Sequence, residues 1–104
     1  SMNSIASLAG GLSGNVLLRS ADVCLKERRP LVLVPRETPL HSIHLENMLT
    51  LSRMGAVVIP PDPAFYLKPQ GINDIVDFVV ARIFMALGLE RTMPDEMQYQ
   101  GPED

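Results

Sequence analysis

The sequence predicts an α/β fold with a parallel, doubly wound sheet, of which only two strands lie within the 104 residues. Helical patterns alternate along the chain with two short, continuously aliphatic runs, at residues 31–34 and 56–59. Aliphatic runs without polar alternation are typical of strands buried on both faces of a parallel sheet. Two strands are too few for a sheet of this class, so we expect the others upstream or in another chain.

Two helices are predicted before the first strand. Residues 5–12 are small and apolar, which suits a helix packed closely on another element. Residues 15–29 carry apolar side chains at the spacing of one buried helical stripe. That stripe comprises Leu17, Ala21, Cys24 and Leu25. Asp22 and Lys26 are four residues apart and predict an ion pair on the helix surface, and Pro30 ends the helix.

The remaining elements follow the same alternation. The strand at 31–34 is bounded by prolines, and a helix is predicted over residues 41–53 with Gly55 as its cap. The apolar side of this helix is expected to comprise Leu45, Met48, Leu49 and Ser52. After the second strand, several prolines predict an ordered loop over residues 62–70.

The most regular helical pattern covers residues 72–89, with Gly71 as its N-cap and acidic residues in its first turns. Its broad apolar face comprises Ile72, Ile75, Val76, Val79, Val80, Ile83 and Leu87. We therefore expect residues 1–90 to form part of one domain and residues 91–104 to form a loosely held polar tail.

Composition argues against several classes of protein. The net charge is −3 without a basic stripe, which gives a nucleic-acid partner little support. The longest apolar run is far shorter than the ~20 residues that span a bilayer, and no signal peptide is expected. The single cysteine, Cys24, cannot form an internal disulfide, which fits a cytoplasmic protein. Its place on a predicted core stripe argues against a role as nucleophile.

Two candidate functional residues directly follow the first predicted strand. Ligands of open parallel sheets bind beyond the carboxyl ends of the strands, and this strand runs directly into Arg36 and Glu37. An arginine there suits a phosphate contact, and a glutamate suits proton transfer. The alternative interpretation is a solvated loop with an ion pair at its edge.

Other candidate residues have ordinary structural explanations. Phe65 and Tyr66, in the proline-rich loop, suit a subunit interface slightly better than a binding site. Arg82 is expected to be an exposed helix arginine. His41 and His44 are three residues apart, but no third ligand at suitable spacing accompanies them, so a metal site is not expected.

Six segments nevertheless resemble the flavin prenyltransferase family, whose members were formerly known as aromatic-acid or polyprenyl-hydroxybenzoate decarboxylases. These segments are residues 1–6, the block NVLLRSADVCLKERRPLVLVPRETPL at 15–40, IHLENM at 43–48, GAV at 55–57, PAFY at 63–66 and DFVVAR at 77–82. The resemblance extends to about Leu89, and the long second block is far more specific than a short motif.

This resemblance implies a three-layer flavodoxin-like or Rossmann-like sheet and a homo-oligomer, typically a dodecamer. It implies transfer of a dimethylallyl group from dimethylallyl phosphate to reduced FMN, without a metal. The product, prenylated FMN, is used in turn by a partner decarboxylase that acts on unsaturated acids, including ubiquinone precursors.

The resemblance also implies roles for individual residues. The segment Ser1, Met2, Asn3 and Ser4 would bind FMN through backbone N–H groups and hydroxyls. Arg36 would contact FMN as well, and Glu37 would transfer protons near the flavin. The donor phosphate would be held by Tyr66 and Arg82, with Lys26 adding charge nearby.

One departure from the family pattern is the absence of its N-terminal strand and glycine-serine loop. We therefore expect the 104-residue chain to be incompetent as an enzyme by itself. Two alternatives stay open: a related FMN-dependent decarboxylase of peptidyl cysteine, and a non-catalytic oligomerising fragment.

Overall fold

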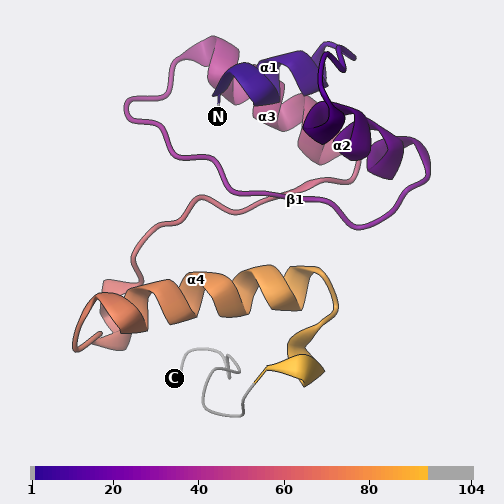
Figure 1. Cartoon of the computed structure of the whole chain (residues 1–104). Coiled ribbons are helices and arrows are strands. Elements are labelled where there is room, and N and C mark those ends of the chain that lie inside the picture. The colour runs from indigo at the N-terminus through magenta and orange to yellow at the C-terminus, as the bar shows by residue number, and fades with distance from the viewer. Residues whose placement is uncertain (1, 94–104) are drawn as a thin grey trace. The chain divides into compact units, whose positions relative to one another are not determined.

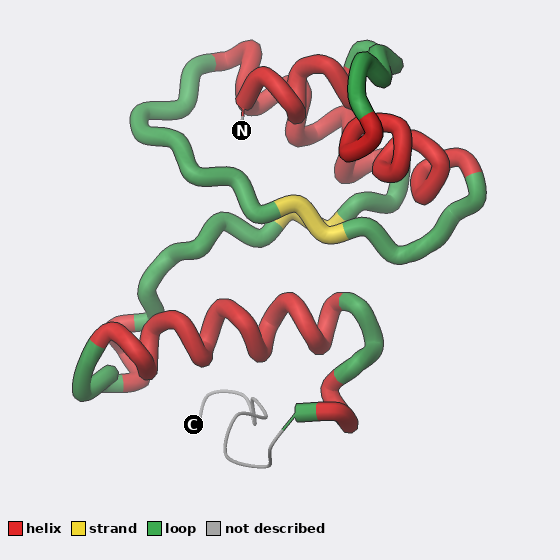
Figure 2. The backbone as a smooth tube through the Cα atoms, in the orientation of Figure 1, coloured by secondary structure: helices red, strands yellow, loops and turns green. Residues whose placement is uncertain are grey.

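The computed structural model describes residues 2–93 and divides the chain into two compact units, one ending at Pro60 and the other beginning at Pro61. Figures 1 and 2 show the elements of both units. No helix among residues 2–93 is long and apolar enough to cross a membrane. The predicted division at residue 90 stays a prediction.

The first unit opens with two helices, α1 (Met2–Ala9) and α2 (Val16–Lys26). α1 begins three residues before the predicted helix and ends where Gly11 adopts a positive φ of 75°. α2 begins at Asn15, whose side-chain oxygen accepts a hydrogen bond of 2.8 Å from the Leu18 amide. Such a side-chain cap satisfies one of the amides that the first helical turn leaves without an internal partner.

The sheet of the first unit consists of β1 (Val32–Leu33) and β2 (Val57–Val58), joined by α3 (Ser42–Arg53). The strands are parallel, with Val32 opposite Val57 and Leu33 opposite Val58. This confirms the predicted parallel pairing and its helical crossover. The expected burial on both faces is not met within the first unit, where no strand residue is fully buried, because its three helices lie on one side of the strand pair (Figure 1).

The buried stripe of α2 agrees with the predicted one at Ala21 and Leu25, and Cys24 is half-buried, but the prediction is wrong at Leu17. Leu17 is 72% exposed, whereas Leu18 is 8% exposed and packs in the core with Leu25. Ala21 lies between them against the same core, as predicted. Both stripes satisfy helical spacing, and contact with α1 decides between them. The predicted Asp22–Lys26 ion pair is not formed among residues 2–93.

The buried side of α3 also differs from the predicted one. Met48 is buried as predicted, but its buried companion is Leu51, whose side chain is fully enclosed. The predicted Leu45 and Leu49 are about half exposed, at 51% and 49%. Apolar residues occur on more than one side of this helix, so its sequence does not specify which side meets α1. Gly55 ends the helix region with a φ of 103°, consistent with the predicted cap.

Replacing Leu51 with alanine should destabilise the first unit by about 2–5 kcal/mol, because it removes a fully buried side chain and leaves a cavity. Leu45→Ala on the same helix is the matched control, since half of that side chain is already in water. Chemical unfolding of both variants checks the prediction. Equal midpoints for the two variants would contradict the described orientation of α3.

The second unit contains a short 3₁₀ turn (Phe65–Leu67), α4 (Ile72–Ala86) and a second 3₁₀ turn (Glu90–Thr92). α4 begins at the predicted Gly71 and ends three residues earlier than predicted, at a turn where Gly88 has a φ of 73°. Its buried residue is Ala81, and most of the predicted apolar face is half-buried, whereas Ile72 and Val76 are exposed at 78% and 50%. Most of the predicted tail, residues 94–104, lies outside the described residues.

Candidate functional site

The segment after β1 carries Arg36 and Glu37, as predicted. Both residues follow buried Pro35 and precede α3, and both side chains are exposed. They occupy the carboxyl end of β1, the edge at which α3 also begins (Figure 1). This edge is the place where parallel sheets bind their ligands.

The start of α1 lies at the same side of the first unit in Figure 1, and α1 packs against α3. Asn3 is exposed and Ser4 half-buried, whereas the Met2 side chain is buried in the core. Met2 therefore offers only its backbone to a ligand at this edge. The first amides of a helix lack acceptors within it and favour anions. The predicted Ser1 lies outside the described residues.

His41 and His44 also lie at this edge, where α3 begins. Each imidazole accepts a hydrogen bond at Nδ1 from the other residue's backbone amide, at 3.3 and 3.4 Å. The two rings are stacked, with centroids 3.5 Å apart. From the sequence alone, metal binding is the only role considered for this pair, and it is not expected. The three-residue spacing at a helix start is also a signal for this capping arrangement. No cluster of three metal-ligating side chains occurs among residues 2–93.

Lys26 does not join this edge within one chain. It is the last residue of α2, and residues 27–31 connect it to the beginning of β1. Lys26, which is exposed, therefore precedes the amino end of that strand, whereas Arg36 and Glu37 follow its carboxyl end. The resemblance placed it beside the other site residues, and the first unit taken alone does not bring it there.

The two remaining predicted residues belong to the second unit. Tyr66 lies in the 3₁₀ turn before α4 and is 63% exposed. Arg82 is an exposed residue of α4, one position after buried Ala81. The predicted site is thus divided between the units, with Asn3, Ser4, Arg36 and Glu37 in the first and Tyr66 and Arg82 in the second.

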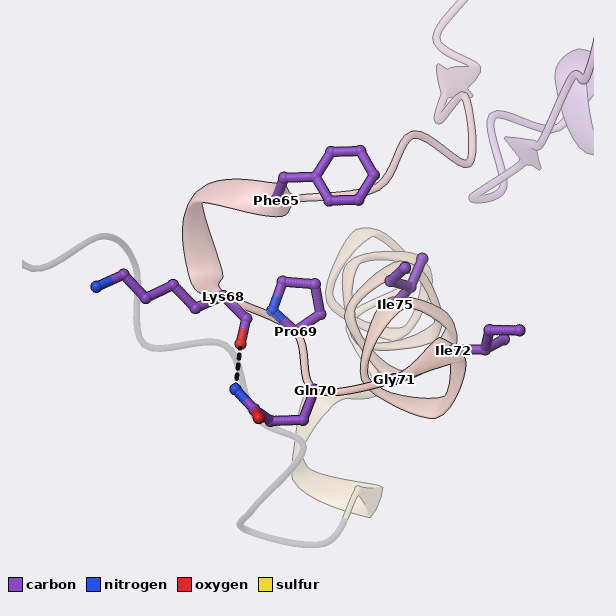
Figure 3. A pocket seen from close by; sticks show the side chains of 7 residues that line it. All are labelled: Phe65, Lys68, Pro69, Gln70, Gly71, Ile72 and Ile75. Carbon is purple, nitrogen blue, oxygen red and sulfur yellow. Dashed lines mark hydrogen bonds between the residues drawn. The ribbon is translucent and has the colours of Figure 1, made fainter.

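The second unit also has a pocket of about 450 Å³ between the loop and the start of α4 (Figure 3). It is lined by Phe65, Lys68, Pro69, Gln70, Gly71, Ile72 and Ile75. Two hydrogen bonds hold Gln70 at this pocket. Its backbone N–H donates to the Asp74 carboxylate at 2.8 Å, and its side-chain amide donates to the Lys68 backbone carbonyl at 3.2 Å. None of the predicted site residues lines the pocket, so it does not provide the predicted substrate site.

Comparison with known families identifies the chain. The family model described as Flavoprotein matches residues 1–84. The chain belongs to this flavoprotein family. The assignment agrees with the α/β arrangement of the first unit and with the flavin site that the sequence resemblance implies.

Curated relatives of this flavoprotein chain are named flavin prenyltransferase UbiX. The Pseudomonas aeruginosa relative is 57% identical over 93 residues, which cover 89% of this chain and 44% of the relative. The Methanocaldococcus jannaschii relative is 52% identical over 93 residues, covering 89% and 50%. These relatives confirm the predicted resemblance. The chain spans about half the length of the curated relatives it matches.

Solved structures confirm the α/β fold class. The chain matches a dodecameric FMN-dependent UbiX-like decarboxylase from Escherichia coli O157:H7 with a TM-score of 0.86 and 52% identity, covering 96% of this chain and 53% of that one. It matches AnUbiX (PadA1) in complex with FMN and dimethylallyl pyrophosphate with the same TM-score and 42% identity, covering 98% and 52%.

Proposed function

We propose that the chain forms part of a flavin prenyltransferase that transfers a dimethylallyl group from dimethylallyl phosphate to reduced FMN. The observation that carries this proposal is the identity of 52–57% with relatives of that name over 93 residues. The structural likeness to a protein that binds FMN and dimethylallyl pyrophosphate supports the same pair of substrates. The prenylated FMN would serve a partner decarboxylase in the cytoplasm.

The flavin would bind at the carboxyl edge of the first unit. The residues present fit a phosphate-bearing flavin, because the exposed guanidinium of Arg36 and the first turn of α1 both favour anions. Asn3 and Ser4 add polar side chains to that turn, and Ser1 and Met2 would contribute backbone amides. Glu37, next to Arg36, is the candidate proton acceptor.

The donor would be held by Tyr66 and Arg82. Its allylic C–O bond breaks with the electron pair going to the departing phosphate, and the allylic carbon bonds to the electron-rich flavin. A cation that meets the departing oxygen stabilises the charge that develops there. Glu37 would accept the proton that the flavin loses at the atom that bonds to the allylic carbon. Closing the ring would move a further proton from a flavin ring carbon to the alkene of the transferred group, without net loss. Lys26 would reach the site from a neighbouring copy of the chain, because its own unit places it at the opposite end of β1.

A homo-oligomer is part of this proposal. Exposed apolar side chains of α4, Ile72 and Val76, suit contact with a second copy of the chain. The similar Escherichia coli protein is described as dodecameric, and a dodecamer is the proposed assembly here. Such an assembly would also supply the copy from which Lys26 is proposed to act.

The test uses a chimera in which this chain replaces the matching 93-residue segment of the Pseudomonas aeruginosa relative. Incubated with reduced FMN and dimethylallyl phosphate, or the pyrophosphate in a parallel arm, the chimera should add the mass of one dimethylallyl unit to the flavin. FMN binding without this mass gain would favour the cysteine decarboxylase alternative. Assembly without FMN binding would favour the oligomerising fragment.

The isolated 104-residue chain should bind FMN more weakly than micromolar, because it spans about half of its relatives and holds two strands of the sheet among residues 2–93. Fluorescence titration of FMN checks this expectation, with the chimera as the positive control. A dissociation constant in the micromolar range or tighter would show that the chain carries a complete flavin site.

A further inference from the structure

The start of α3 is held by two imidazoles that act as acceptors. The amide of His44 donates to His41 Nδ1 at 3.3 Å, and the amide of His41 donates to His44 Nδ1 at 3.4 Å. This reciprocal pattern has the form of a capping box, which usually pairs Ser or Thr with Glu or Gln. Unlike those side chains at neutral pH, imidazole changes its charge between pH 5 and 8.

Protonation is incompatible with this arrangement. A neutral imidazole accepts at one ring nitrogen, whereas a protonated imidazole donates at both. A proton on either Nδ1 would therefore point a donor at a backbone N–H and break that hydrogen bond. Two charged rings with centroids 3.5 Å apart would also repel each other at the positive end of the helix dipole. No acidic residue in the first turn offsets this charge.

No carboxylate forms an ion pair with either imidazole in the part of the chain that the structure describes. α1 and β2, which pack against α3, carry no titratable side chain. On α3 itself Glu46 and Arg53 are exposed, and Arg36 and Glu37 lie in the preceding segment. The uncharged forms of both rings are thus the ones that fit the described structure.

We propose that His41 and His44 form a proton-sensitive cap that loosens the first turn of α3 as the pH falls. The cap is complete when both rings are neutral and is lost when either is protonated, so its contribution to stability decreases toward acidic pH. The segment that it anchors, residues 34–40, contains Arg36 and Glu37. The cap is independent of the proposed function, and only its effect on flavin binding rests on that function.

Amide hydrogen exchange of the full 104-residue chain, measured by NMR and corrected for the intrinsic exchange rate, tests the cap. Protection of the His44 amide should fall by about fivefold between pH 7.5 and pH 5.5, the size expected for loss of one helix cap. The Leu18 amide is the internal control, because its cap is the amide side chain of Asn15, which does not titrate. Equal pH dependence of the two amides would overturn the proposal.

The double variant His41→Ser with His44→Gln provides the matched comparison, because a Ser and Gln capping box does not titrate in this range. In this double variant, the hydrogen-exchange protection of the amide at position 44 should be the same at pH 7.5 and pH 5.5. A fall as large as that of the unmodified chain would overturn the proposal, since it would show that another group causes the loosening.

The consequence for the site is measured in the chimera. Its affinity for FMN should fall more between pH 7.5 and pH 5.5 than that of the chimera carrying the Ser and Gln box. If FMN affinity has the same pH dependence in both chimeras while the exchange result holds, the cap exists but does not affect flavin binding. No FMN binding at either pH would count against the proposed function alone, because the exchange experiment contains no flavin.

Discussion

Replacing Arg82 with alanine in the chimera should lower kcat/KM for the dimethylallyl donor by about 10²–10³, the usual cost of removing one group that stabilises developing negative charge. The residue is an exposed cation of α4, and the departing phosphate gains charge as the C–O bond breaks. The dissociation constant of FMN should stay unchanged, since the proposed flavin contacts lie in the first unit. Steady-state kinetics and a separate FMN titration measure the two effects.

Arg91→Ala is the matched control, because Arg91 is another exposed arginine of the second unit and has no proposed role. It should leave both constants unchanged. Arg82→Lys should retain part of the activity, since it keeps the charge but loses the planar geometry that suits phosphate. If Arg82→Ala weakens FMN binding and leaves the donor kinetics intact, Arg82 does not bind the donor.

Glu37→Gln should lower the rate of prenylated FMN formation by about 10²–10⁴, the contribution typical of a positioned proton acceptor. Glutamine preserves the size and polarity of the exposed side chain but does not accept the proton. Affinities for FMN and for the donor should therefore change little. Single-turnover formation of product, followed by mass spectrometry of the flavin, separates this chemical step from binding.

Glu46→Gln controls for the loss of one carboxylate nearby in the sequence, because Glu46 is exposed on α3 and has no proposed role. It should form product at the unmodified rate. If the Glu37→Gln chimera forms product at the unmodified rate, a group other than Glu37 accepts the proton. A rate loss that disappears at saturating FMN would assign Glu37 to binding instead.

Most elements of the fold were predictable because their signals are local. α2 ends at Lys26, three residues before the predicted end, at a turn where Arg28 has a positive φ of 56°. Gly55 and Gly88 adopt the positive φ that helix ends favour, and Gly71 precedes α4. The two aliphatic runs pair as parallel strands, as their lack of alternation indicates. Backbone preferences of this kind act over a few residues and need no knowledge of distant packing.

The buried sides of the helices were less predictable. Leu17 and Leu18 are adjacent and equally apolar, yet only Leu18 is buried. Leu51 is fully buried on α3, where Leu45 and Leu49 were expected. Each helix has apolar residues on several sides, so contact with α1 and the strand pair selects the buried one. In a chain that spans about half of its relatives, the other apolar sides stay exposed.

For the candidate site, the strand-end rule predicted where Arg36 and Glu37 lie, because a polar pair directly after a buried strand occupies the carboxyl edge of a parallel sheet. The same rule says nothing of Lys26, which the tertiary structure places near the amino end of β1. It also did not reveal that His41 and His44 cap each other's amides, since that depends on ring orientation.

The amino-acid sequence by itself determined the order of helices and strands, the parallel class of the sheet and the membership of the flavoprotein family. These properties follow from local preferences and from side-chain patterns that persist along the chain. Only the tertiary structure decided which helix faces are buried and which candidate residues share an edge, because both depend on contacts between segments that are distant in sequence.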